Sequence, residues 1–351
     1  MKDRFERRLA HVPAETLAKV AGIDELKGRW VGGLQLNPQA LGRLKRSVLV
    51  TSTGSSTRIE GARLTDEEVE KVMQGVQTRK LSDRDSQEVK GYYELLHNVF
   101  DAWVSIRLSE STIKHFHNQL LKYVEKDQRH RGDYKKIENL VEMFDEKGKS
   151  VGIIFAPTKA YLTPKEMQEL VDWTKDALEK QKYHPLLIVG NFLVEFLKIH
   201  PFQDGNGRLS RILTNLLLLK AGYQYIPYVS HEKLIEDNKN SYYLALRKSQ
   251  NSFGGKKEDI FPWLHYFLDI LLKQSEIATK LIQSEEVEKL LSPRQLQVWS
   301  YLQEVIEAGP GEICDKTRIT KPTVIQALNR LIKLKKIERI GMGRATRYRK
   351  L

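Results

Sequence analysis

Residues 200–211 read His-Pro-Phe-Gln-Asp-Gly-Asn-Gly-Arg-Leu-Ser-Arg. One apolar run, 186–199, leads into this stretch, and a second, 209–219, leads out of it. Apolar runs of this length predict two buried helices, so one polar loop is expected where they meet. The loop contains an imidazole, a carboxylate, two glycines around an amide, and two guanidinium groups. This combination predicts a phosphate-binding site with a proton acceptor beside it.

The second half of the stretch has the features of an anion site. Gly205, Asn206 and Gly207 stand where the second helix is expected to begin. Free N–H groups and the positive end of the helix dipole favour an anion there, and glycine lets a ligand approach the backbone. Arg208 and Arg211 are three positions apart, so both project from the first turn on one side. Their guanidinium groups are expected to hold two phosphates of a polyphosphate.

The first half supplies a base and a metal ligand. His200 follows the first helix and can be neutral near pH 7, so it can take a proton from an attacking hydroxyl. Asp204 offers hard oxygen ligands that suit Mg²⁺, which normally arrives with nucleotide phosphates. Pro201 and Phe202 are expected to pack and to fix the turn.

Each feature taken singly has an ordinary structural explanation. A histidine before a proline is usually structural, an Asp-Gly-Asn-Gly run is usually a tight turn, and an arginine pair on a helix usually faces solvent. The joint pattern favours a site, because a turn alone does not explain so many charged and donor groups between two strongly apolar helices.

The pattern His-Pro-Phe-x-Asp-Gly-Asn-Gly-Arg-x-x-Arg resembles, at every defined position, the signature of the Fic (filamentation induced by cAMP) family. The resemblance implies a mainly α protein: a Fic fold helical core with a β-hairpin flap. It also implies transfer of AMP from ATP to a Ser, Thr or Tyr hydroxyl of a target protein or of the protein itself, with release of pyrophosphate. The related death-on-curing kinases depart from Gly-Asn-Gly-Arg, so adenylylation is favoured over phosphorylation.

By the same resemblance, His200 is the general base, Asp204 is the Mg²⁺ ligand, and Arg208 and Arg211 hold the β- and γ-phosphates of ATP. The nucleotide-binding residues that it implies are Val151, Gly152, Ile153 and Ile154 in the flap; Asp204, Gly205, Asn206, Gly207, Arg208, Leu209, Ser210 and Arg211 in the signature; and Tyr242, Tyr243 and Gln250 around the adenosine.

The flap residues lie in one of two apolar, β-rich runs, 141–144 and 151–155, around a turn at 145–148. Such a pattern predicts a hairpin. The resemblance implies that this hairpin aligns the hydroxyl-bearing segment of the target by strand addition. The local sequence suits an ordinary surface hairpin equally well.

Tyr242 and Tyr243 are adjacent in a helix expected over 233–250, so they cannot share one face. One ring can pack inward while the other meets a ligand. The resemblance places this pair in the adenosine pocket, together with a polar side chain two turns later. Gln250 falls at that position, and the neighbouring Asn251 is the alternative because Asn is more usual there.

A second informative segment, 55–61, reads Ser-Ser-Thr-Arg-Ile-Glu-Gly. Ser56 and Glu60 lie four positions apart, on one face of a helix that is expected to run toward residue 53 and end here. Gly61 can close the helix in a left-handed cap. Residues 65–68 form a capping box that starts a new helix. On local evidence alone this is a helix end followed by a helix start.

The segment also resembles the inhibitory helix of Fic proteins, Ser/Thr-x-x-x-Glu-Gly/Asn. The resemblance implies that Glu60 pairs with Arg211 and occupies the place of the γ-phosphate, so that the enzyme is autoinhibited. The same carboxylate could instead position water for removal of AMP, and the sequence leaves both roles open.

Composition sets outer limits. The 351 residues are 40% hydrophobic and 29% charged, as in globular proteins. The single cysteine, Cys314, excludes an internal disulfide and a Cys-rich zinc site. The charged N-terminal residues 1–8 lack the apolar segment of a signal peptide, and no apolar run is long enough to cross a membrane. A cytoplasmic location without membrane contact is expected.

The net charge of +13 is concentrated at the C-terminal end. Residues 292–351 contain 13 Lys and Arg against 5 Asp and Glu, a difference of +8. This segment is expected to form a helix, a turn, further helices and a basic glycine-centred hairpin, an order that resembles a winged helix-turn-helix. Such a unit would place one helix in the DNA major groove and the wing arginines on phosphates. The candidate DNA contacts are Lys321, Thr323, Gln326 and Arg330 on the recognition helix and Arg344, Arg347 and Arg349 in the wing. A winged helix that binds protein or dimerises remains the alternative.

Three regions are therefore expected: an N-terminal helical region with the inhibitory helix at 1–83, the Fic catalytic core at 84–285, and the winged helix-turn-helix at 290–351. Two functional classes remain: an autoregulated AMP transferase, and a DNA-binding regulator whose core only senses nucleotide. The intact His200 favours the first, because a sensor needs no base there. A homodimer is left open. Further helices are expected at 86–103, 109–126, 163–181, 258–290 and 292–307.

Overall fold

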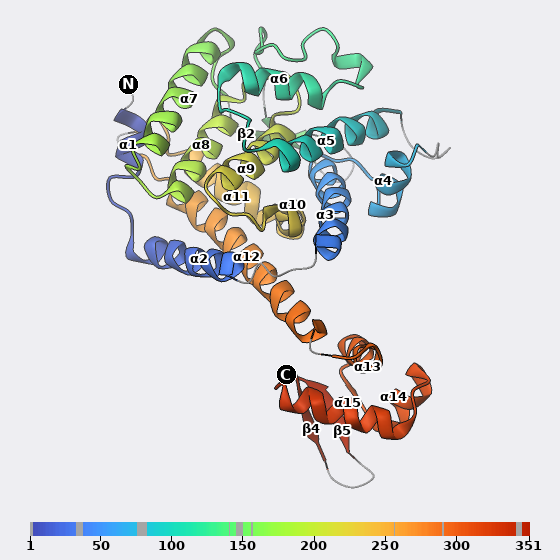
Figure 1. The fold of residues 1–351 in the computed structure, drawn as a ribbon. Coiled ribbons are helices and arrows are strands. Elements are labelled where there is room, and N and C mark those ends of the chain that lie inside the picture. Colours follow the sequence, from blue (N-terminus) through green and yellow to red (C-terminus); the bar gives the residue numbers. More distant parts are fainter. Residues whose placement is uncertain are drawn as a thin grey trace. The chain divides into compact units, whose positions relative to one another are not determined.

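The computed structural model describes residues 3–32, 38–75, 83–139, 141–144, 150–155, 157–255, 257–289, 291–341 and 346–351. The chain divides into two compact units, Met1–Ala278 and Thr279–Leu351. The mainly α fold expected from the sequence is confirmed (Figure 1).

The first unit is built around two buried helices, α8 (Pro185–Ile199) and α9 (Asn206–Lys220). Thirteen of the fifteen residues of each helix are buried. A helix that is buried on nearly all sides needs other helices around it, and both lie inside the bundle (Figure 1). The helices that accompany them are α1 (Asp3–Arg8), α2 (Ala14–Gly32), α3 (Pro38–Ile59), α4 (Asp66–Met73), α5 (Asp83–Ala102), α6 (Glu110–Leu120), α7 (Thr163–Glu179), α10 (His231–Glu236) and α11 (Lys239–Gln250), with 3₁₀ turns at Glu125–Asp127, Ala160–Leu162 and Ile226–Tyr228. Helix α12 (Phe261–Lys289) belongs to this unit up to Ala278 and to the second unit from Thr279.

Two helices differ from those expected. α3 ends at Ile59, within the 55–61 segment where the sequence predicts its end, but α6 stops at Leu120 instead of reaching 126. The single helix expected over 233–250 is two helices, α10 and α11. The break lies at Asn238, whose φ of −125° is not helical and whose side-chain amide donates to Leu234 O at 3.0 Å. An Asn side chain that bonds nearby backbone in this way competes with helix continuation.

The expected hairpin is present as β1 (Val141–Phe144) and β2 (Ser150–Phe155), which pair antiparallel. Val141 lies opposite Phe155 and Phe144 opposite Ser150, with two irregularities in the register. β2 lies against α11. The residues expected to form the turn, 145–148, lie outside the described residues.

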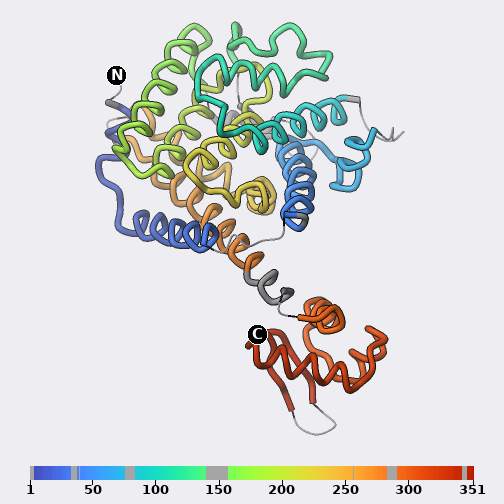
Figure 2. The backbone as a smooth tube through the Cα atoms, in the orientation of Figure 1, coloured from blue at the N-terminus to red at the C-terminus, as the bar shows by residue number. Residues whose placement is uncertain are grey.

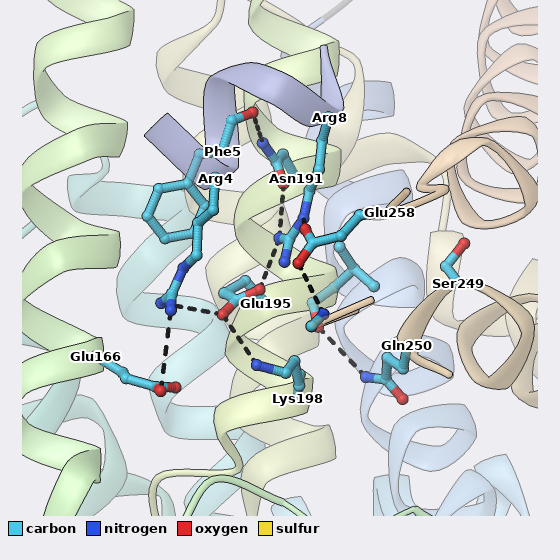
Figure 3. A network of polar contacts seen from close by, with 12 residues as sticks. Arg4, Phe5, Arg8, Glu166, Asn191, Glu195, Lys198, Ser249, Gln250 and Glu258 are labelled. Carbon is cyan, nitrogen blue, oxygen red and sulfur yellow. Dashed lines mark hydrogen bonds and ion pairs between the residues drawn. The ribbon is translucent and has the colours of Figure 1, made fainter. Parts of the chain in front are cut away.

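The N-terminal helix α1 is anchored to α7 and α8. Phe5 packs on Trp173 of α7 with ring centroids 5.0 Å apart. Arg8 donates to Glu195 Oε2 of α8 at 2.6 Å, and Arg4 lies 3.2 Å from Glu195 Oε1 (Figure 3). Burial alone would raise the pKa of Glu195, but the charges of Arg8, Lys198 and Arg4 outweigh it and lower that pKa. These ion pairs explain why an otherwise apolar helix contains a carboxylate.

The second unit has its own apolar core beneath three helices and a small sheet. Its elements are α13 (Pro293–Glu304), β3 (Glu307–Ala308), α14 (Pro310–Thr317), α15 (Lys321–Lys333), β4 (Ile337–Ile340) and β5 (Arg347–Lys350), and the antiparallel strands follow the order β3, β5, β4. The helix expected to reach 307 ends at Glu304, where Val305 turns extended and the chain enters β3. Figure 2 traces the chain through this unit.

No helix in the described part of the chain is long and apolar enough to cross a membrane.

Candidate active site

The loop between α8 and α9 turns at two residues with positive φ. His200 ends α8 at φ 50° and ψ 61°, and its N–H donates to Phe196 O at 2.9 Å. A left-handed conformation is costly for histidine, so the surrounding contacts must impose it. Gly205 precedes α9 at φ 78°, where glycine carries no such cost. The signature residues are thereby placed between the end of one buried helix and the start of the next.

Asn206 and His117 fix this loop from two sides. Asn206 accepts from Phe202 N–H at 2.9 Å and donates to Phe202 O at 2.8 Å. His117, on α6, stacks on the Phe202 ring with centroids 3.8 Å apart. Its Nδ1 accepts from Gly132 N–H at 2.8 Å, so its Nε2 is the nitrogen that donates to Asp204 O at 3.0 Å. Burial lowers the pKa of His117 to about 4, which keeps this neutral tautomer at pH 7.

Lys135 is a buried lysine beside the loop that the sequence did not single out. Its ammonium donates to Ile199 O at 3.0 Å and to Asn139 Oδ1 at 2.8 Å, and its backbone N–H donates to Pro201 O at 2.8 Å. Burial lowers the pKa of Lys135 to about 8. Nothing in the sequence indicates that His117 or Lys135 supports this loop, because their bonds to Asp204, Ile199 and Pro201 each cross more than sixty residues.

His200 has the properties of a base. It is half-buried, and its Nδ1 lies 3.3 Å from Leu197 O. Since a carbonyl oxygen only accepts, Nδ1 carries the proton and Nε2 is the basic nitrogen. Burial, with a further contribution from the charge of Lys135, lowers the pKa of His200 to about 4. The imidazole is therefore neutral and able to accept a proton at pH 7.

Glu60 places its carboxylate at the N-terminus of α9. Arg211 NH2 donates to Glu60 Oε1 at 2.7 Å, while Arg211 also donates from Nε to Ser56 Oγ at 2.7 Å and from NH2 to Ser56 O at 2.9 Å. A Cβ added at Gly207 would come within 2.2 Å of Glu60 Oε1. Burial lowers the pKa of Arg211, but the charge of Glu60 outweighs it and raises that pKa. An anionic side chain thus lies where the helix dipole and a guanidinium favour an anion.

The end of α3 fixes the position of Glu60. Gly61 has a φ of 105°, its N–H donates to Arg58 O, and Ala62 N–H donates to Thr57 O, each at 3.1 Å. These two bonds make a Schellman cap in which Glu60 is the C-cap residue, directly after the last helical residue, Ile59. About a third of the Glu60 side chain is exposed, whereas Arg211 is buried.

Arg208 and Asp204 belong to a cluster of charges. Arg208 NH1 lies 2.7 Å from Glu88 Oε2, and its NH2 donates to Asp204 Oδ2 at 3.2 Å. Arg84 also donates to Asp204 Oδ2 at 3.2 Å. Burial raises the pKa of Asp204, but the charge of Arg208, the Gly205 N–H and Arg84 outweigh it, so that pKa is lowered. Asp204 is therefore an ionised carboxylate at neutral pH.

The described residues contain no group of three or more His, Cys, Asp or Glu side chains able to hold a metal ion. A Mg²⁺ ion at Asp204 would accordingly take most of its ligands from phosphate oxygens and water, which suits this cation.

Leu209 and Ser210 face the protein interior. The Leu209 N–H donates to Gly205 O at 2.9 Å as part of the helix, and Leu209 is fully buried. Ser210 Oγ donates to Gly207 O at 2.7 Å.

The two tyrosines of α11 point differently, as expected for adjacent residues. Tyr242 is buried, and its ring lies 5.8 Å from that of Trp263. Tyr243 is half-buried, and burial together with the charge of Glu60 raises its pKa. Gln250 instead turns toward α8, where its amide donates to Val194 O at 3.3 Å (Figure 3). Asn251 is exposed.

The flap residues Val151, Gly152, Ile153 and Ile154 lie in β2. Their side chains are outside the described part of the structure, so only the backbone of the strand is placed.

In the second unit, Lys321, Gln326 and Arg330 are exposed on α15, and Thr323 is half-buried. Arg347, expected from the sequence to lie in a wing, is 2.8 Å from both Glu307 and Glu312. The candidate DNA contacts therefore differ in their surroundings. Lys321, Gln326 and Arg330 of α15 are exposed, whereas Arg347 and Arg349 are paired with carboxylates, Arg349 with Glu338. Arg344 lies outside the described residues.

Comparison with known proteins gives a family for this site. The Fic/DOC family model matches residues 107–218. "Protein adenylyltransferase Fic" of Drosophila virilis is 29% identical over 156 residues, which cover 41% of this chain and 30% of that protein. "Probable protein adenylyltransferase aq_aa38" of Aquifex aeolicus is 27% identical over 139 residues, which cover 39% of this chain and 42% of that protein. The chain thus matches less than half the length of these relatives.

Two crystal structures share the fold. A Fic family protein from Desulfovibrio desulfuricans has a TM-score of 0.62 at 23% identity and covers 97% of both chains. A Fic domain containing signaling protein from Bacteroides thetaiotaomicron has a TM-score of 0.62 at 23% identity and covers 75% of this chain and 97% of that one.

Proposed function

This chain belongs to the Fic/DOC family through residues 107–218, and on that premise we propose that it is a protein adenylyltransferase. It transfers AMP from ATP to a Ser, Thr or Tyr hydroxyl of a target protein or of itself, and it releases pyrophosphate. Relatives from Drosophila and Aquifex carry the name adenylyltransferase, which supports the reaction class.

The observation that carries the proposal is the carboxylate of Glu60 at the first turn of α9, bonded to Arg211 at 2.7 Å. A carboxylate held there by a guanidinium and a helix N-terminus indicates a site for anions. When Glu60 leaves, the same corner suits the terminal phosphate of ATP. Arg208, in the same helix turn, is assigned to the β-phosphate.

The chemistry needs one base and one polarised phosphorus. The target hydroxyl oxygen bonds to the α-phosphorus of ATP while the bond from that phosphorus to the bridging oxygen breaks, and pyrophosphate leaves with the electron pair. The hydroxyl proton goes to His200 Nε2. The pKa of His200, which burial lowers to about 4, keeps this nitrogen free of a proton at pH 7.

Asp204 is the residue that would hold Mg²⁺, and the ion would neutralise charge on the phosphates when bound. Asp204 suits this role because it is ionised and about a third of its side chain is exposed. Its present partners, Arg84 and Arg208, would be shared with or released to the nucleotide.

We further propose that Glu60 inhibits the enzyme. Arg211 cannot give the same NH2 group to Glu60 and to a γ-phosphate, so ATP binds in a poor pose while the pair is closed. The other role for Glu60 is to orient a water molecule for AMP removal. It uses the same carboxylate and needs solvent access, which the exposed third of the Glu60 side chain supplies.

Incubation with Mg²⁺ and ATP labelled on the α-phosphate tests the proposal. Glu60→Gly is expected to raise covalent labelling, and adding His200→Ala is expected to lower it by roughly 10²–10⁴-fold. A folded Glu60→Gly variant that binds ATP and takes up no label would instead favour a nucleotide-sensing regulator.

For the second unit we propose a winged helix-turn-helix. The order of its helices and strands supports this, and exposed Lys321 and Arg330 on α15 support DNA as a partner. A protein partner or a dimer contact is the competing proposal. We also propose that the protein is cytoplasmic.

A further inference from the structure

Arg58 lies two residues before Glu60, in the last turn of α3, and makes a two-point contact with Glu236. Arg58 Nε donates to Glu236 Oε1 at 2.6 Å, and Arg58 NH2 donates to Glu236 Oε2 at 3.1 Å. Both side chains are 20% exposed. A paired geometry of this kind is stronger and more directional than a single hydrogen bond.

The Arg58 guanidinium also binds the segment that follows α3. Arg58 NH1 donates to Leu64 O at 2.7 Å and lies 2.9 Å from Asp66 Oδ1 in the first turn of α4. Arg58 therefore joins the end of α3, the segment after Gly61 and α10. These contacts contribute to holding the last turn of α3, which Glu60 follows directly.

Helix α10, which carries Glu236, is itself fixed to the core. Glu232 is fully buried and accepts from Asn215 of α9 at 2.7 Å and from Tyr92 of α5 at 3.0 Å. Ser230, at the N-terminus of α10, accepts from Ser52 of α3 at 2.8 Å. Glu236 thus presents its carboxylate from a firmly held helix.

Glu60, in contrast, holds Arg211 by one hydrogen bond at 2.7 Å and is followed by a glycine with positive φ. If that hydrogen bond alone held Glu60 in place, an incoming nucleotide phosphate would need only to rotate the Glu60 side chain away from Arg211. The Arg58–Glu236 pair, together with the two bonds from Arg211 to Ser56, holds the last turn of α3 against a shift away from an incoming phosphate. The restraint on Glu60 therefore includes the pair behind it.

We propose that the Arg58–Glu236 pair is a latch that sets how strongly Glu60 blocks Arg211. This inference rests on the proposed function, because it assumes that Glu60 restrains AMP transfer. Arg58 and Glu236 are positioning residues: they act on the reaction through Glu60.

The test is the initial rate of self-labelling by α-labelled ATP in the full chain, with Glu236→Ala made in two backgrounds. In the otherwise unchanged protein, Glu236→Ala is expected to raise the rate roughly threefold to tenfold, the scale of one partly exposed ion pair. In the Glu60→Gly background the same change is expected to leave the rate unaltered, because there is no carboxylate left to release. Glu236→Gln keeps the side-chain shape and should raise the rate less.

Asp237→Ala is the matched control. Asp237 is the next carboxylate of the chain, and it pairs with Lys233 at 2.7 Å with both side chains nearly half exposed. Its removal is expected to leave the rate unchanged in both backgrounds. Thermal unfolding of each variant shows whether it is folded.

The outcomes separate the two proposals. If Glu60→Gly does not raise labelling, the inhibitory role fails first. If Glu60→Gly raises it but folded Glu236→Ala and Glu236→Gln do not, the latch alone is overturned. A rise with Glu236→Ala that is equal in both backgrounds also overturns it, since the effect then bypasses Glu60.

Discussion

Gly207 lies in the candidate site at a position with no space for a side chain. A Cβ there would lie 2.2 Å from Glu60 Oε1 and 2.9 Å from its carboxyl carbon. The carboxylate oxygen occupies the place proposed for a phosphate oxygen, so a side chain at 207 fills the anion site itself. The backbone does not require glycine at this position, because Gly207 is an ordinary helical residue of α9; if a phosphate binds here as proposed, the ligand requires it.

Gly207→Ala is accordingly expected to lower self-labelling at least tenfold in the Glu60→Gly background, where no carboxylate competes for the site. Steric exclusion of the phosphate is the reason, and the apparent affinity for ATP should fall with the rate. Gly28→Ala in α2 is a fitting control, because nothing lies within 4 Å of a Cβ added there. Unimpaired labelling of Gly207→Ala would mean that phosphate does not approach this turn.

At this scale the sequence could predict the residues of the signature, because they lie within twelve positions of each other. It could also propose Glu60 as the partner of Arg211, but only through resemblance, since 151 positions separate the two. His117 and Lys135 were missed as supports of the loop. Their roles arise from one stacked ring and a few hydrogen bonds to distant backbone, for which no local pattern exists.

Helix α8 is the element on which the site depends, because it ends at His200. It contains one fully buried carboxylate, Glu195, surrounded by Arg8, Arg4 and Lys198. Arg8 is the best buried of the three cations and also bonds Glu258 at 2.5 Å (Figure 3). Helix α1 therefore contributes charge to the core as well as the ring of Phe5.

Arg8→Met is expected to destabilise the protein by about 3 kcal/mol or more, because Glu195 stays buried with weaker partners. Arg4→Met removes a longer and more exposed pair and should cost about 1 kcal/mol or less. Urea unfolding of the two variants gives the comparison. Equal losses for both would show that Arg8 is not the principal partner of Glu195.

Element by element, local signals predicted the two buried helices, the hairpin and the capping box at Thr65, whose two bonds to Glu68 are present. The break between α10 and α11 escaped prediction, because it depends on one Asn238 side chain bonding to Leu234 O. Strand β3 was not predicted either, because its two residues form a strand only by pairing with Arg349 and Tyr348 of β5.

At the scale of the whole molecule, two units with separate cores divide the proposed tasks. The second unit offers exposed Lys321 and Arg330 on α15, while Arg347 is already paired with Glu307 and Glu312. If the unit binds DNA, the helix and not Arg347 supplies its phosphate contacts.

Lys321→Ala and Arg330→Ala, made in the full chain, are therefore expected to weaken duplex binding and each to reduce its salt dependence by roughly one phosphate contact. Arg347→Ala should change binding little and stability more. Titration of a labelled duplex at several salt concentrations measures all three. No binding by the unchanged protein even at low salt would leave a protein partner or a dimer contact as the role of this unit.

The position of Glu60 at the capped end of α3 has a consequence for how the enzyme responds to its surroundings. If Glu60 blocks Arg211 as proposed, the blocking group is part of the same chain as the site, so its effective concentration there is a constant of the fold. Dilution of the protein then cannot relieve the block, whereas a higher nucleotide concentration can. A protein regulated in this way would respond to changes in ATP concentration over a range in which an unblocked one is already saturated.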